Sequence, residues 1–154
     1  MQETSISSSS QLEYSLRAYT DQDLPFIFNS FLKSYRQSPL NLCIPNKVYY
    51  EEYHRVLEKI LSNQTTGVVI ACSESDPGEI FGWLMASITE NGPTLIFVYV
   101  KQAYRHLGIA TNLFKYAFPQ YPNNLSYCFH TTTGALWLVH VYGQPVAFMP
   151  LKGH

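Results

Sequence analysis

The hydrophobic and polar positions of the first sixty residues predict one strand followed by two helices. Residues 14–19 alternate well enough for a strand, and Thr20, Asp21 and Asp23 then offer N-cap oxygens for a helix. The hydrophobic positions of that helix recur at one-face spacing: Leu24, Phe28, Phe31, Leu32 and Tyr35. After a loop with two prolines, Asn46 can cap a second helix. Its expected buried face is formed by Tyr50, Tyr53, His54, Leu57, Ile60 and Leu61.

The remaining pattern predicts further strands around one more helix. Short hydrophobic or β-branched runs predict strands at 67–72, 80–88, 95–101, 125–131 and 145–151. A helix is expected from Gly108 to about residue 118, where Pro119 and Pro122 stop it. Residues 135–142 are ambiguous between helix and strand. There are no repeats, so we expect one domain over 12–154 behind a flexible tail over 1–11.

Composition narrows the class of protein. The chain has 154 residues, 46% of them hydrophobic, and a formal net charge of −1, which gives no global attraction to nucleic acid or anionic membrane. Cys43, Cys72 and Cys128 are widely spaced and odd in number, which argues against a disulfide framework and fits a reducing cytoplasm. Cys128 lies between two aromatic residues and is expected in the core rather than as an acyl carrier. No metal-ligand spacing, membrane-spanning run or signal peptide is visible.

The most informative segment joins the strand at 95–101 to the helix that begins at Gly108. Small residues at a helix start, here Gly108 and Ala110, let main-chain N–H groups approach an anion closely, and the helix dipole adds to the attraction. Arg105 is placed to add a cationic donor to the same anion. The segment therefore predicts a pyrophosphate cradle with the rest of the ligand along the strand. The alternative is that both small residues only permit close helix–strand packing.

Arg105-x-x-Gly108-x-Ala110 resembles the R/Q-x-x-G-x-G/A signature of the GNAT N-acetyltransferase superfamily, which binds acetyl-coenzyme A. A valine-rich strand and Tyr104 precede it, as in that family, and the order of predicted elements matches over nearly the whole chain. The resemblance implies an α/β (α+β) fold with a mixed, mostly antiparallel central sheet, flanking helices and a splayed strand pair. One departure is that 132–154 is short for the family's last helix and hairpin. A weaker resemblance is to small acyltransferases of phages and prophages.

The resemblance also implies how the cofactor is held. Main-chain groups around Val98 and Val100 would bind pantetheine and polarise the thioester carbonyl, and N–H groups from His106 to Thr111 would hold the pyrophosphate. The implied cofactor-binding residues are Val98, Val100, Arg105, His106, Leu107, Gly108, Ile109, Ala110 and Thr111. The acetyl group would pass directly from acetyl-coenzyme A to an amine, without a metal.

Proton transfer has several candidates. In many family members a tyrosine roughly one element after the fifth strand protonates the leaving thiolate, and Tyr142 lies at about that distance. In a chain with twelve tyrosines it is also a plausible strand or rim aromatic. Tyr127 and His130 compete for the role, and His130 could act as a base near neutral pH. The strand at 95–100 carries no carboxylate, so the amine loses its proton through water, Glu90 or a residue outside the strand.

The acceptor side is expected at the first two helices and the loop between them. The polar or aromatic candidates there are Ser34, Tyr35, Arg36, Ser38, Glu51 and Glu52. The two glutamates could attract a cationic amine, or simply form a solvated helix face. Aromatic residues interleaved with lysine and arginine could instead hold a nucleobase. The acceptor is thus a small molecule, a protein or a modified nucleobase.

Three functions follow from these residues. The leading one is an acetyl-coenzyme A-dependent N-acetyltransferase in the cytoplasm, with no membrane association and with a homodimer compatible with its exposed aromatics. The second is a non-catalytic coenzyme A-binding or protein-binding module on the same fold, because the strand lacks a carboxylate and the C-terminal part is short. The third is a nucleic-acid-binding domain, whose binding would depend on salt.

Overall fold

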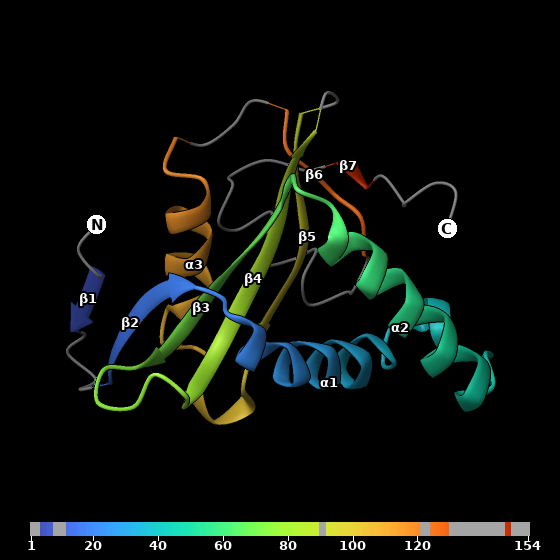
Figure 1. The fold of residues 1–154 in the computed structure, drawn as a ribbon, viewed down its shortest axis with the longest axis horizontal. Coiled ribbons are helices and arrows are strands. Elements are labelled where there is room, and N and C mark those ends of the chain that lie inside the picture. The colour runs from blue at the N-terminus through green and yellow to red at the C-terminus, as the bar shows by residue number, and fades with distance from the viewer. Residues whose placement is uncertain (1–3, 8–11, 90–91, 121–123, 130–146, 149–154) are drawn as a thin grey trace.

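A computed structural model describes residues 4–7, 12–89, 92–120, 124–129 and 147–148 of the chain. The described strands form one sheet in the order β1-β2-β3-β4-β5-β6-β7, with antiparallel pairs from β1 to β5 and parallel pairs from β5 to β7. Helix α3 covers one face of this sheet, and α1 and α2 lie on the other (Figure 1). The fold is therefore the mixed, mostly antiparallel α/β architecture that the sequence predicts.

The bounds of the elements follow the hydrophobic pattern closely. The strands are β1 Thr4–Ser7, β2 Glu13–Ala18, β3 Thr66–Ser73, β4 Ile80–Thr89, β5 Gly92–Val100, β6 Ser126–Tyr127 and β7 Ala147–Phe148. The α-helices are α1 Leu24–Tyr35, α2 Asn46–Ser62 and α3 Ile109–Ala117. Short 3₁₀ turns occur at Asp21–Asp23, Pro39–Asn41 and Gln102–Tyr104. None of the described helices is long and apolar enough to cross a membrane.

The two sheet faces carry separate hydrophobic cores. The core under α1 and α2 contains Phe31, Trp83 and Phe97, and the core under α3 contains Leu84, Leu113 and Phe114. Neighbouring residues of β4 contribute to opposite cores because successive side chains of a strand point to opposite faces. This alternation places β4 and β5 between the two helical layers, with α3 on the left of the strands and the α1–α2 pair on the right in Figure 1.

The structure corrects the expected buried face of α1. Ile27 and Ser30 are buried, whereas Leu24 and Phe28 of the predicted face are only partly buried. Ser30 tolerates burial because its hydroxyl accepts a hydrogen bond from Trp83 Nε1 at 2.8 Å and donates to the main-chain oxygen of Phe26. The prediction is confirmed for Phe31, Leu32 and Tyr35, which are buried. It omitted Ser30 because hydrophobic spacing alone does not count a polar residue whose hydrogen bonds are satisfied.

The expected face of α2 is confirmed at Leu57 and at the partly buried core contacts Tyr53, Ile60 and Leu61, and it is wrong at two positions. Tyr49, Val56 and Leu57 are the buried residues, while Tyr50 and His54 are exposed. The Tyr49 hydroxyl donates to the main-chain oxygen of Leu32 at 2.6 Å, so the phenol is buried without an unpaired donor. Asn46 does not cap this helix either.

Helix α2 begins at Asn46 directly after Pro45, which occupies the N-cap position without a side-chain hydrogen bond.

At the N-terminus, residues expected in a flexible tail form β1 at Thr4–Ser7, paired antiparallel with β2. The backbone of this short polar segment satisfies the edge of β2, a main-chain interaction that side-chain polarity does not reveal.

One ion pair ties β2 to the start of α1. The Arg17 guanidinium donates to both carboxylate oxygens of Asp23, at 2.7 and 2.9 Å, and to the main-chain oxygen of Pro77. The Asp23 carboxylate also accepts from the main-chain N–H of Thr20 at 2.8 Å. The hydrogen bond from Arg17 is the main reason that the pKa of Asp23 lies below its usual value of 3.8.

This pair predicts a pH dependence of stability. Because the pKa of Asp23 is lowered in the folded state, its contribution is complete above the unfolded pKa of 3.8 and is lost as the pH falls below it. Between about pH 6 and pH 2, the unfolding free energy of the wild type should fall by about 1.4 kcal/mol more than that of Asp23→Asn for each unit of the pKa shift. Urea unfolding of both proteins at several pH values measures this. Parallel pH profiles would contradict it.

Candidate active site

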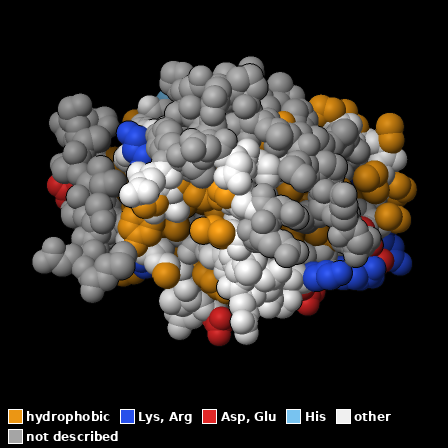
Figure 2. Space-filling view, turned by 90° about the horizontal axis from the view of Figure 1, so that it is seen from above, with side chains coloured by type: hydrophobic (Ala, Val, Ile, Leu, Met, Phe, Trp, Pro, Cys, Tyr) orange, Lys and Arg blue, Asp and Glu red, His pale blue; other side chains and the backbone are white. Residues whose placement is uncertain are grey.

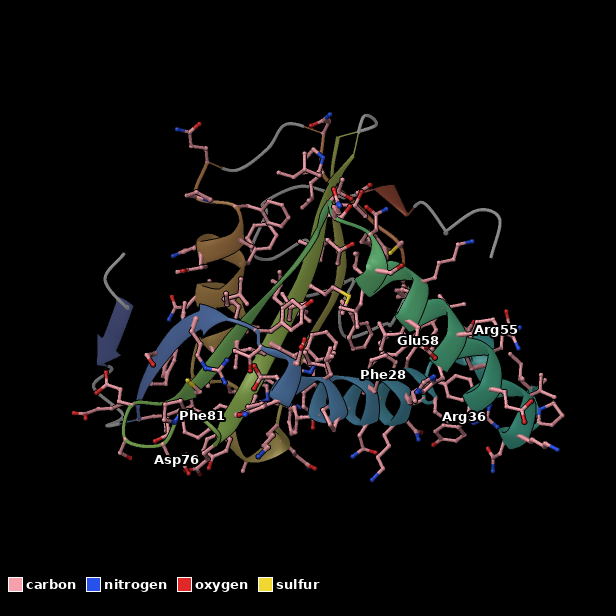
Figure 3. All side chains as sticks on the ribbon, viewed as in Figure 1. Phe28, Arg36, Arg55, Glu58, Asp76 and Phe81 are labelled. Atoms are coloured by element: carbon pink, nitrogen blue, oxygen red, sulfur yellow. The ribbon has the colours of Figure 1, made fainter. Side chains whose placement is uncertain are left out.

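The loop between β5 and α3 is fixed at both of its ends. Tyr104 closes a turn by donating its N–H to the main-chain oxygen of Lys101 at 2.9 Å, and its ring packs on Phe81, whose position is labelled in Figure 3. The next residue, Arg105, is extended and donates from Nε to the main-chain oxygen of Val100 at 2.9 Å. The described residues offer no partner for the terminal guanidinium nitrogens of Arg105, which is exposed. These nitrogens are therefore available to a ligand.

Two residues of this loop have left-handed backbone conformations. His106 has a φ of 67° and Gly108 a φ of 83°, and right-handed helix residues follow Gly108 directly. Left-handed and right-handed residues in succession point consecutive N–H groups into one concavity, an arrangement that binds anions. The N–H of Asn112 closes the first turn on the main-chain oxygen of Gly108 at 3.0 Å. Sequence spacing located Gly108, whereas nothing in the sequence indicated the strained conformation of His106.

The main-chain N–H groups of residues 106–111 have no hydrogen-bond acceptor within the described part of the chain. A Cβ atom placed on Gly108 would meet no atom within 4 Å, so the mouth of the concavity is open on that side. These are the donors of a helix N-terminus that an anion would satisfy. The alternative, that Gly108 only permits close helix–strand packing, is not supported at this residue.

The outer edge of β5 is paired only at one end. Thr94 and Leu95 pair with β6, and the N–H of Cys128 donates to the main-chain oxygen of Leu95 at 3.3 Å. Beyond Leu95 the described residues provide no further ladder on this side, while β5 continues to Val100 beside β4. Residues 130–146 lie outside the described part of the chain, so the splayed strand pair that the sequence resemblance implied stays a prediction. The main-chain groups of Val98 and Val100 point away from β4, because the neighbouring Lys101 donates its N–H to the main-chain oxygen of Phe81.

A bulge in β5 lies at the start of this unpaired stretch. Leu95 pairs with Ala86 and Phe97 with Met85, so Ile96 is an extra residue in the ladder. Three consecutive residues are buried there instead of alternate ones. A bulge turns the strand locally and changes the direction of its main-chain groups. The bulge is a feature that sequence reasoning missed, because no glycine or proline marks it.

The electrostatics of the two halves of the chain differ. All eleven acidic residues lie before residue 91, whereas Lys101, Arg105, Lys115 and Lys152 follow it. The loop and helix that present the unpaired N–H groups therefore lie in a segment with only positive formal charge, which favours an anionic ligand there. The overall charge of −1 conceals this separation.

The candidates for proton transfer are only partly placed. Tyr142, His130 and Glu90 lie outside the described residues. Tyr127 is in β6 and partly buried. Cys128 is buried, and desolvation raises its pKa to about 12, so its thiol is protonated at neutral pH. The prediction that Cys128 belongs to the core is confirmed.

This burial predicts selective thiol chemistry. Cys43 is exposed, whereas Cys72 and Cys128 are buried. In the native protein iodoacetamide should alkylate Cys43 at least about 100-fold faster than Cys128, because the reaction needs an accessible thiolate. Peptide mass spectrometry over a time course measures both rates, with urea-unfolded protein as the control in which all three react. Fast native labelling of Cys128 would restore it as a candidate acyl carrier.

The acceptor candidates between α1 and α2 have mostly structural contacts. Arg36, labelled in Figure 3, donates to the main-chain oxygens of Asn41 and Ile44 at 2.8 and 2.6 Å and lies over the Tyr49 ring. Ser38 is buried, and Ser34 Oγ donates within its own helix to the main-chain oxygen of Phe31. Arg36 thus shapes the α1–α2 loop and is not a free cation.

Tyr35 is a buried residue of the core between α1, α2 and the sheet. Its ring contacts Phe97 of β5 and Phe129, which follows β6, with centroids 6.2 and 5.0 Å apart. Burial raises the pKa of Tyr35, so it is a neutral phenol. On α2, Glu51 is exposed and Glu52 pairs with Arg55 at 3.2 Å, as expected for a solvated helix face. The described residues contain no group of three potential metal ligands.

The comparison with protein families identifies this architecture. The model of the acetyltransferase (GNAT) family matches residues 25–148, a range that includes the loop between β5 and α3 and runs from the first turn of α1 to β7. The chain belongs to the GNAT acetyltransferase family. As a GNAT enzyme it is an N-acetyltransferase that uses acetyl-coenzyme A and an amine acceptor.

Solved structures show the same fold at low sequence identity. A candidate acetyltransferase from Pyrococcus furiosus superposes with a TM-score of 0.68 at 17% identity, covering 92% of this chain and 99% of that one. A candidate acetyltransferase from Bacillus subtilis superposes with a TM-score of 0.64 at 14% identity, covering 92% of this chain and 98% of that one. An aminoglycoside N-acetyltransferase in complex with coenzyme A superposes with a TM-score of 0.54 at 14% identity, covering 92% of this chain and 93% of that one. No curated protein matches the chain in sequence.

Proposed function

We propose that the chain binds acetyl-coenzyme A with the diphosphate on the N–H groups of residues 106–111 and the thioester arm beside β5. The observation that carries this proposal is the left-handed Gly108 turn, whose N–H groups have no acceptor in the described part of the chain. Small side chains at Gly108 and Ala110 leave the approach open, and Arg105 adds a cationic donor. The absence of any acidic residue after residue 90 favours the same ligand.

The chemistry requires an activated carbonyl and a neutral amine. Acetyl-coenzyme A supplies the thioester carbon that the amine nitrogen attacks. Main-chain groups of β5 at Val98 and Val100, re-aimed by the bulge at Ile96, polarise the carbonyl oxygen, and one such donor contributes on the order of 3 kcal/mol. Direct transfer to the amine is favoured over a covalent intermediate because the Cys128 thiol is buried and protonated.

Tyr142 is our proposed acid for the leaving thiolate, and His130 our proposed base. Their support is sequence position alone, together with the lack of a carboxylate in β5. The acceptor enters from the side of α1 and α2, where Tyr35 contacts Phe97 of β5 and Phe129 after β6. Its identity as a small molecule, a protein or a modified nucleobase is open, and the phage resemblance has no support from the solved neighbours, which include a Bacillus subtilis protein.

The proposed setting is a reducing cytoplasm. The three cysteines are free, which agrees with that compartment. A homodimer is our proposed assembly, because Leu42 and Val48 expose 67% and 55% of their surface near the start of α2. Hydrophobic side chains gather at one end of the face shown in Figure 2.

Calorimetric titration with acetyl-coenzyme A tests the proposed function directly. We expect binding in the micromolar range, and thiol release when a panel of amines is added. Folded protein that binds acetyl-coenzyme A without releasing thiol with any amine would favour the non-catalytic module. Folded protein that binds no acetyl-coenzyme A would overturn the proposal. Salt-dependent binding to DNA or RNA, measured in parallel, would support the nucleic-acid alternative.

A further inference from the structure

Two directional hydrogen bonds meet at Asn112 in the first turn of α3. Its main-chain N–H donates to the oxygen of Gly108 at 3.0 Å, and its side-chain Nδ2 donates to the Tyr14 hydroxyl at 2.6 Å. Tyr14 lies in β2, 98 residues earlier in the chain, and only 1% of its surface is exposed. The same residue therefore closes the Gly108 turn and connects that turn to the sheet.

The other contacts of α3 with the sheet are hydrophobic and have no preferred direction. The helix has nine residues and packs through Ile109, Leu113 and Phe114. The Cα atoms of a helix lie about 2.3 Å from its axis, so a rotation of about 20° moves each of them by about 0.8 Å and turns the attached N–H groups with them. Hydrogen bonds weaken steeply with such changes in distance and angle. The Tyr14–Asn112 bond is thus suited to set the rotation of the helix start.

We propose that Tyr14 and Asn112 are positioning residues for the diphosphate of acetyl-coenzyme A. They hold the N–H groups of residues 109–111 in the direction that the ligand needs, and they do not touch the reacting atoms. This inference rests on the proposed function of the Gly108 turn. It assigns a role in cofactor binding to a tyrosine far from the signature, in a strand at the opposite end of the chain.

Tyr14→Phe removes the hydroxyl and keeps the buried ring, so the variant should fold. Its dissociation constant for acetyl-coenzyme A is expected to rise about 5- to 10-fold, which is the increase expected when one hydrogen bond is lost. In steady-state kinetics the KM for acetyl-coenzyme A should rise by a similar factor while kcat changes less than about 2-fold. Asn112→Ala should have the same effect, and the double variant should be no worse than either single one.

Amide hydrogen exchange without any ligand separates a local role from general destabilisation. In Tyr14→Phe the Asn112 amide, bonded to Gly108, should exchange several-fold faster. The Phe118 amide, bonded to Phe114 at the other end of α3, should be unchanged. Tyr19→Phe, which removes a partly buried hydroxyl beside the opposite core, is the matched control.

The outcomes distinguish this inference from the proposed function. Wild-type protein that binds acetyl-coenzyme A, with Tyr14→Phe binding equally well, would overturn the positioning role alone. Equal acceleration of exchange at Asn112 and Phe118 would also overturn it, because the loss would then be of overall stability. Wild-type protein that fails to bind acetyl-coenzyme A would overturn both proposals together.

Discussion

Replacement of Gly108 by aspartate is expected to weaken acetyl-coenzyme A binding by about 100-fold or more, whereas asparagine at this position weakens it only several-fold. Aspartate and asparagine have nearly the same shape, and both accept left-handed backbone better than most residues, as the φ of 83° requires. They differ in charge. A carboxylate at the mouth of the concavity repels the diphosphate by several kcal/mol, and about 2.7 kcal/mol corresponds to 100-fold.

Isothermal titration of both variants measures this difference, and circular dichroism checks that each is folded. Because the comparison is between two variants at one position, the strain of a side chain on left-handed backbone largely cancels. Equal affinities for Asp and Asn at position 108 would show that the diphosphate does not lie at this turn. A higher salt concentration should reduce the difference in acetyl-coenzyme A affinity between the two variants, since ions screen exposed charges.

Gly82→Ala is expected to lower the unfolding free energy by about 1–3 kcal/mol and to weaken acetyl-coenzyme A binding about 10-fold. A Cβ on Gly82 would lie 2.5 Å from the main-chain oxygen of Tyr99 and 3.2 Å from Val100 Cα, both in β5. The main chain of β5 must therefore move. Its displacement would shift Val100, whose oxygen holds Arg105 at 2.9 Å, and with it the start of the loop.

Gly67→Ala in β3 is the matched control, because a Cβ there meets no atom within 4 Å. We expect a change of less than about 0.5 kcal/mol in its unfolding free energy and wild-type binding. Urea denaturation and calorimetry give both quantities for the two variants. If Gly82→Ala kept the stability and the affinity of the wild type, the prediction would be wrong. β4 and β5 would then move apart at this point without any loss of free energy.

The sequence predicted the elements better than their orientation. The boundaries of β3, β4, β5 and α3 agree with the structure to within about three residues, because hydrophobic runs and turn residues are local signals. The buried faces of α1 and α2 were predicted only in part, because the hydroxyls of Ser30 and Tyr49 are satisfied by partners that are distant in sequence. The strand at Thr4–Ser7 was missed because its pairing uses main-chain groups.

For the site, local sequence determined the cofactor loop. Arg105, Gly108 and Ala110 lie within six consecutive residues, and their size and charge already predict an anion cradle. The charge of the segment after residue 90 is equally a property of local sequence. Only the tertiary structure decided the rest. The bulge at Ile96, the parallel pairing of β5 with β6 and the Tyr14–Asn112 bond each depend on residues brought together from distant parts of the chain, and no periodicity within one segment encodes such a contact.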